Sequence, residues 1–235
     1  MIFEKPVKKS ERPVVVFLHG FGSKRTGELQ AFKDRFENDY DILMPEYFDP
    51  ADPDDCSGIL WAQRCLHTVQ TQLLKQRKVI LAGFSMGGVI ATWIASVVHV
   101  EKLILLAPAY DLINFKNTGN IINSVISHMK GNGMTGQMSH FDDLPSSFYQ
   151  TLFDVVLQYR DSCSKIDCPV LLIQGNKDTI VSLPASRICF HKMPSDQKQL
   201  FVIEEGHHVL LQDEGVVREV LGLIQLFLDD LIVIR

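Results

Sequence analysis

The sequence predicts an α/β fold, with a mostly parallel sheet between two layers of helices. Short apolar runs alternate with amphipathic ones along the chain, which favours a doubly wound sheet with right-handed crossovers. The apolar runs are almost unbroken, as in strands that are buried on both faces. A length of 235 residues is enough for one such domain with a substantial core.

Six apolar runs are predicted as strands because each is short and nearly continuous in apolar residues. They cover residues 13–20, 40–47, 78–84, 101–109, 169–175 and 198–206.

The segments between these runs carry apolar residues at helical spacing. In the second of them Leu66, Val69 and Leu73 recur every three or four residues. The predicted helices cover residues 28–37, 57–76, 86–98, 183–193 and 215–231.

Residues 110–166 interrupt this alternation. They contain no convincing strand, and residues 130–136 are rich in glycine. Because a structureless loop of this length is unusual in a compact domain, we interpret the segment as an inserted helical cap. The core domain is then predicted to comprise residues 1–109 and 167–235.

Composition excludes several classes of protein. A formal charge of −5 and a pI near 5.9 give no basic surface for nucleic acid. No long apolar segment suggests a membrane span, and the first residues lack the apolar stretch of a secretory signal, so we expect a cytoplasmic protein.

The cysteines are predicted to be reduced, with a Cys163–Cys168 bridge as the alternative. They are Cys56, Cys65, Cys163, Cys168 and Cys189.

Ser85 lies where a predicted strand meets a predicted helix. Gly83 and Gly87 flank it in the pattern GxSxG, which is typical of a strained strand-to-helix turn that exposes a nucleophilic serine. The following helix would direct unpaired N–H groups and a partial positive charge at this point. The pattern is short, so a purely structural turn is the alternative interpretation.

An acid and a base follow two later strands. Asp178 comes after residues 169–175, and His207 comes after residues 198–206. The order Ser, Asp, His along the chain is that of a nucleophile, an acid and a base in this kind of turn. Asp178 could instead cap a turn, and His208 is the alternative base because one residue decides which ring faces the site.

An oxyanion that forms when a nucleophilic serine attacks a carbonyl group would need two N–H donors. We expect one from Met86, directly after the serine, and the other from Phe21, in the loop after the first predicted strand. His19 in the same loop is interpreted as a structural group. A metal site at the two adjacent histidines is disfavoured, because no third ligand is placed to join them.

These motifs together resemble the α/β-hydrolase superfamily. Its elements occur in the expected order over nearly the whole chain, as HGFG (19–22), GFSMGG (83–88), GNKDTIV (175–181) and GHH (206–208). GFSMGG is similar to the nucleophile turns of esterases, monoacylglycerol lipases and lysophospholipases. The acidic segment 48–58 departs from the family pattern, and the short start of the chain implies a reduced sheet of about six to seven strands.

The resemblance implies a serine hydrolase of small-molecule carboxylic esters that works through an acyl-enzyme. Ser85, Asp178 and His207 would form its triad, with Phe21 and Met86 as oxyanion donors and with no cofactor or metal. A thioesterase or depalmitoylase with the same triad, or a non-catalytic binding module, is the alternative.

Apolar residues of the predicted cap could line a pocket for small to medium acyl chains, or could pack the cap itself. They are Phe115, Ile121, Ile122, Val125, Met129, Met134, Met138 and Phe141.

Overall fold

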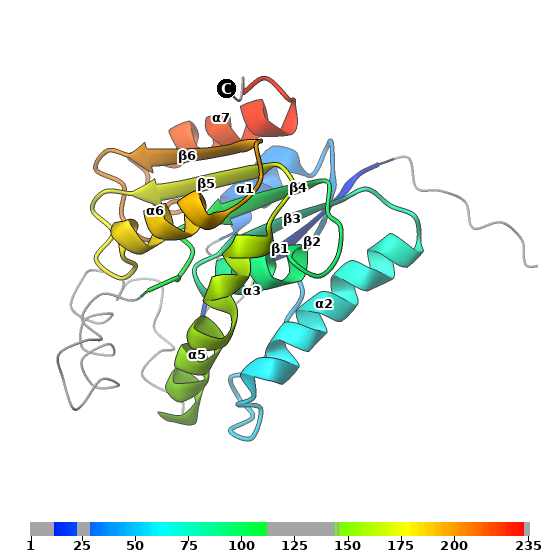
Figure 1. Ribbon diagram of the computed structural model, residues 1–235, viewed down its shortest axis with the longest axis vertical. Helices are drawn as coiled ribbons and strands as arrows, with labels where there is room; N and C mark the ends of the chain where they lie inside the picture. Colours follow the sequence, from blue (N-terminus) through cyan, green and yellow to red (C-terminus); the bar gives the residue numbers. More distant parts are fainter. Residues whose placement is uncertain (1–11, 23–28, 112–143, 145, 233–235) are drawn as a thin grey trace, which may run out of the picture.

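The computed structural model of the protein describes residues 12–22, 29–111, 144 and 146–232. Within these residues six strands form one sheet, in the order β2-β1-β3-β4-β5-β6, and every neighbouring pair is parallel (Figure 1). This architecture confirms the predicted α/β class. The strands are β1 (Val14–Leu18), β2 (Asp41–Leu43), β3 (Val79–Phe84), β4 (Lys102–Leu106), β5 (Val170–Gly175) and β6 (Lys198–Ile203).

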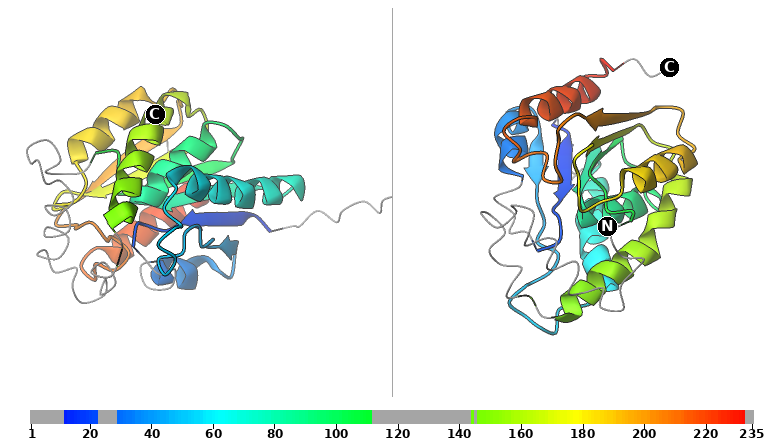
Figure 2. Two further views of the ribbon diagram at one scale, coloured as in Figure 1. Left: turned by 90° about the horizontal axis from the view of Figure 1, so that it is seen from below. Right: turned by 90° about the vertical axis from the view of Figure 1, so that its left-hand side faces the viewer.

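Helices cover both faces of the sheet (Figure 2). One apolar cluster joins the sheet to α2, α3, α5 and α6, and a second cluster joins the opposite face to α1 and α7. The helices are α1 (Gln30–Phe36), α2 (Gly58–Leu74), α3 (Met86–Ala95), α5 (Ser146–Tyr159), α6 (Leu183–Lys192) and α7 (Val217–Leu228), with a 3-10 helix, η3 (Arg160–Lys165).

Strand β1 shows why its sequence is continuously apolar. Its alternate residues Val14, Val16 and Leu18 face the cluster of α2 and α3, whereas Val15 and Phe17 face the cluster of α1 and α7. All five are fully buried. A strand covered on both faces has no side on which a polar residue would be solvated, so its apolar run is unbroken.

Helix α5 lies within residues 110–166, the segment predicted to be a cap. Its side chains Phe148, Leu152 and Val155 are buried in the same cluster as α2 and α3, so α5 belongs to the helical layer of the core. Residues 112–143, which include all eight predicted pocket residues, lie outside the described residues.

All five cysteines are free thiols, and four of them are buried. Cys163 and Cys168 are therefore not bridged. In the part of the chain that the structure describes, no helix has the length and apolar character needed to cross a membrane.

Candidate active site

Ser85 occupies the sharp turn between β3 and α3. Its backbone has φ 52° and ψ −118°, a conformation that costs a non-glycine residue about 1–3 kcal/mol. Hydrogen bonds hold the turn: the Ser85 N–H donates to the carbonyl of Leu106 at 3.0 Å, and the Ser85 carbonyl accepts from the N–H of Gly88 and of Ala109, both at 3.0 Å. The predicted strained turn is therefore present, and the sheet enforces it.

Close packing explains the glycine two residues after the serine. A Cβ atom at Gly87 would overlap the carbonyl oxygens of Leu18 and His19 at the end of β1. The first turn of α3 can lie this close to β1 only where residue 87 has no side chain. The glycine thus sets the depth at which Ser85 lies above the sheet.

A chain of two hydrogen bonds joins Ser85 to His208 and Asp178. The Nε2 atom of His208 lies 3.1 Å from Ser85 Oγ, and its Nδ1 atom lies 2.8 Å from Asp178 Oδ2. All three side chains are buried. With the Nδ1 proton directed to the carboxylate, Nε2 has a free lone pair that can accept the serine proton.

The expectation that His207 faces Ser85 is wrong. The side chain of His207 is 69% exposed, and its Nδ1 atom lies 3.0 Å from Asp213 Oδ2 on the outer side of the loop. The ring of the adjacent His208 is buried, so the two neighbouring rings face different surroundings. The structure brings His208, the alternative base, to the serine.

The Asp178 carboxylate is held from several directions. Its Oδ1 atom accepts the N–H groups of Ile180 and Val181, both at 2.9 Å, and Oδ2 also accepts from Gln174 Nε2 at 3.3 Å. Burial raises the pKa of this carboxyl, but the charge and hydrogen bond of His208 and the two N–H groups outweigh burial and lower it overall. Asp178 is therefore an ionised partner for His208.

The loops that carry Asp178 and His208 are in direct contact. A Cβ atom at Gly175 would overlap the carbonyl oxygen of Gly206, so the ends of β5 and β6 approach each other more closely than side chains allow. The N–H of Lys177 donates to that same carbonyl at 3.0 Å. This contact helps to fix the position of Asp178 relative to His208.

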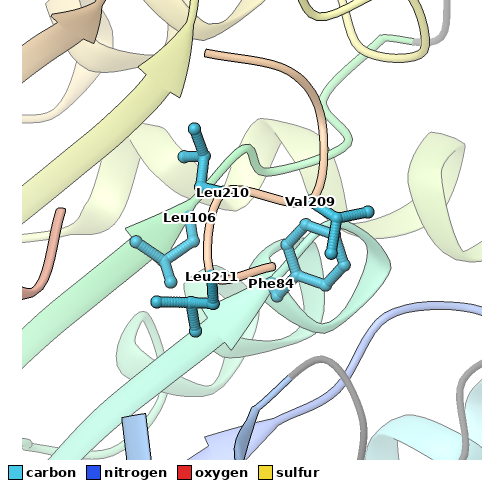
Figure 3. Close-up of a pocket in the computed structure, with 5 residues that line it drawn as sticks. All are labelled: Phe84, Leu106, Val209, Leu210 and Leu211. Carbon is cyan, nitrogen blue, oxygen red and sulfur yellow. The ribbon is translucent and has the colours of Figure 1, made fainter. Parts of the chain in front are cut away.

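Apolar side chains anchor the loop beyond His208. Val209, Leu210 and Leu211 enclose a small apolar space with Phe84 of β3 and Leu106 of β4 (Figure 3). The ring of Phe84 also packs on the imidazole of His208, with the ring centroids 5.0 Å apart. The imidazole of His208 is thus supported by Phe84 of the sheet and by the carboxylate of Asp178.

The loop after β1 is packed by aromatic side chains. His19 is buried and stacks on Tyr47 with centroids 4.3 Å apart, and its Nδ1 atom lies 2.8 Å from the carbonyl of Gly20. Its contacts are those of a structural group. The ring of Phe21 packs against Phe48, with 6.2 Å between the ring centroids.

Met86 is the first residue of α3, and the N–H groups of a first helical turn have no partner within the helix. The positive end of the α3 helix dipole therefore lies at Ser85, the residue that precedes the helix. The roles of the Met86 and Phe21 N–H groups as oxyanion donors stay predictions. Among the described residues no cluster of three or more His, Cys, Asp or Glu side chains could hold a metal ion.

Comparison with known proteins finds hydrolases. Residues 138–215 match the family described as "Serine aminopeptidase, S33". A carboxylesterase of Bacillus subtilis (strain 168) is 21% identical over 142 residues, and the match spans 58% of this chain and 58% of that protein.

Solved structures of lipolytic enzymes superpose on nearly the whole chain. One, described with the metagenome-derived enzymes LipS and LipT, has a TM-score of 0.77 at 16% identity and covers 93% of this chain and 94% of that one. A monoglyceride lipase from Saccharomyces cerevisiae has a TM-score of 0.71 at 18% identity, with 96% and 89% covered. These likenesses confirm the predicted α/β-hydrolase fold.

Proposed function

We propose that this chain, a member of the α/β-hydrolase superfamily, is a serine hydrolase that cleaves carboxylic esters with small to medium acyl chains. The observation that supports this most strongly is the hydrogen-bonded series Ser85–His208–Asp178, buried at one edge of the sheet. A serine hydroxyl is a weak nucleophile until a base removes its proton, and the base needs an oriented acid. The Ser85 hydroxyl is within hydrogen-bond distance of His208, and His208 is within hydrogen-bond distance of Asp178.

In the first step, His208 Nε2 accepts the Ser85 proton while Oγ attacks the ester carbonyl. The imidazolium that forms is stabilised by the Asp178 carboxylate, which stays ionised. The tetrahedral intermediate then collapses, its C–O bond to the alcohol breaks, and His208 returns the proton to the leaving alkoxide. The product of this step is an acyl group on Ser85.

The developing oxyanion would be held by the N–H groups of Met86 and Phe21. The Met86 N–H belongs to the first turn of α3, where the helix dipole also favours negative charge. Fixed donors of this kind contribute strongly because they need no rearrangement during the reaction.

In the second step, water replaces the alcohol. His208 accepts a proton from the water, the hydroxide attacks the acyl carbon, and the second tetrahedral intermediate expels Ser85 Oγ, which regains its proton from His208. The acid product leaves and the free enzyme is restored.

Similarity to proteins described as a carboxylesterase and a monoglyceride lipase supports the proposal that the substrates are esters. The free state of all five cysteines supports the cytoplasm as the compartment.

The test uses a fluorophosphonate probe, which labels activated serines. We expect rapid labelling of the wild-type protein and none of Ser85→Ala, with both proteins equally folded by circular dichroism. Undiminished labelling of Ser85→Ala would refute the proposal.

A panel of p-nitrophenyl esters, acyl thioesters and aminoacyl amides then identifies the bond that is cleaved. We expect the highest kcat/KM for esters with small to medium acyl chains. Turnover of thioesters or amides alone would replace the ester assignment while leaving the triad in place.

A further inference from the structure

We propose that Asp213 is a positioning residue, whose carboxylate fixes the loop carrying His208 so that the imidazole stays in register with Ser85. This inference rests on the proposed function, because it concerns the orientation of the base. The hydrogen-bond partners of the Asp213 carboxylate are His207 and Gly215, so any effect on His208 is transmitted through the loop.

The Asp213 side chain links the two ends of a short loop. Its Oδ2 atom accepts the backbone N–H of His207 at 3.2 Å and lies 3.0 Å from the ring Nδ1 of the same residue. Its Oδ1 atom accepts the N–H of Gly215 at 3.1 Å. One carboxylate therefore holds the residue before His208 and a residue just before α7.

The backbone of Asp213 extends this connection into the helix. Its carbonyl accepts the N–H of Val216 at 3.0 Å and of Val217 at 2.8 Å, at the start of α7. Helix α7 is itself fixed, because Val220, Ile224 and Phe227 are buried against the sheet. Asp213 thus adds a tie between the loop and helix α7.

The residue that Asp213 holds, His207, directly precedes His208. A rotation about the backbone of residue 207 would move the imidazole away from Ser85 Oγ, which lies 3.1 Å from Nε2. Proton transfer requires this distance and alignment, and a displacement of about 1 Å can reduce a rate by about 100-fold.

Charge supports the same role. Burial raises the pKa of Asp213, but its hydrogen bonds with His207 and Gly215 outweigh burial and lower it overall, so the group accepts hydrogen bonds as a carboxylate at neutral pH. Another acid of this loop, Glu205, is exposed, and its carboxylate lies 3.4 Å from the Lys177 ammonium group. Glu205 provides a matched control.

The experiment compares Asp213→Ala, Asp213→Asn and Glu205→Ala with the wild-type protein. Measurements are the rate of fluorophosphonate labelling, kcat and KM for a p-nitrophenyl ester, and Tm. The concentration of competent sites is set by active-site titration, so a smaller folded fraction does not lower the measured kcat. We also record the downfield proton resonance of the His208–Asp178 hydrogen bond, using His208→Gln to assign it.

We expect Asp213→Ala to lower kcat and the labelling rate by about tenfold while KM changes by less than about twofold. Asp213→Asn keeps one acceptor oxygen and should lose about threefold, and Glu205→Ala should match the wild type. The downfield resonance should shift or broaden in Asp213→Ala and should be unchanged in Glu205→Ala.

The inference is overturned if folded Asp213→Ala retains the wild-type kcat, or if only its Tm falls. If Asp213→Ala does not fold, Asp213→Asn decides, and a kcat equal to that of the wild type overturns the inference. A wild-type protein that the probe does not label would instead refute the proposed function, so the two failures are distinguishable.

Discussion

Two substitutions one residue apart, His207→Gln and His208→Gln, test the site most directly. His208 is buried, and its Nε2 atom lies 3.1 Å from Ser85 Oγ. Glutamine at position 208 would therefore remove the base that contacts the serine. Loss of the histidine of such a triad lowers kcat by about 10⁴-fold or more. His207→Gln removes one exposed contact with Asp213 but keeps the backbone N–H, so we expect a loss within about threefold.

The two variants should therefore differ in kcat by about 1000-fold or more. The assay is hydrolysis of a p-nitrophenyl ester at neutral pH, with fluorophosphonate labelling as a second readout and Tm as the control for folding. If His207→Gln were the inactive variant, or if both retained activity, the assignment of His208 as the base would be incorrect.

Three further predictions concern stability and pH. Gly87→Ala should lower the free energy of unfolding by about 3 kcal/mol, because its Cβ atom overlaps the Leu18 carbonyl, whereas Gly222→Ala on the open side of α7 should raise it by about 0.5–1 kcal/mol; urea unfolding measures both. Lys102→Met removes an ammonium group that donates to two carbonyl oxygens in the last turn of α7, both at 2.8 Å, and should cost about 2 kcal/mol, seen as a lower Tm. Folding lowers the pKa of Asp178, so the unfolded chain takes up this proton at a higher pH than the folded protein does. The resulting stabilisation is complete above about pH 5 and is lost as the pH falls through the pKa of the folded protein. The difference in urea midpoint between the wild type and Asp178→Asn should therefore shrink as the pH falls.

The sheet could be predicted from the sequence because burial on both faces leaves a simple pattern. All six predicted strands are present, although several are shorter than their apolar runs. Residues 40–47 illustrate the difference, since only Asp41–Leu43 pair with β1. Beyond Leu43 the chain leaves the sheet, and Tyr47 instead donates a hydrogen bond to the carbonyl of His19. A run of apolar residues predicts burial, but it does not show where a strand ends.

The identity of the base could not be predicted in the same way. Which of two adjacent rings faces Ser85 depends on the turn after β6, where Glu205 adopts a positive φ of 59°. A positive φ is uncommon for a glutamate and gives no sign in the sequence, so the course of this turn could not be predicted. The nearest available signal was Asp213, six residues after His207, which could have indicated an outward-facing partner for that ring.

Helix α5 lies in the segment that was interpreted as a helical cap, and its packing against the core could not be predicted for a different reason. Its buried side chains include Phe148, Leu152, Val155 and Tyr159, which recur at intervals of three and four residues. The pattern was therefore present within residues 110–166, but the absence of strands led to one interpretation for the whole segment. A segment interpreted as one unit can contain an element of the main core.

The parallel arrangement of the sheet also implies that Ser85 and His208 are brought together late in the folding of this chain. Ser85 and His208 are 123 residues apart, and the base follows β6, the edge strand that pairs only with β5. Contacts of such long sequence separation form slowly, because the loops between them must first be ordered. During refolding, far-ultraviolet circular dichroism would recover as helices form, whereas the hydroxyl of Ser85 would become reactive only when the C-terminal quarter of the chain has docked. Reactivity toward a fluorophosphonate is then a kinetic marker for completion of the sheet.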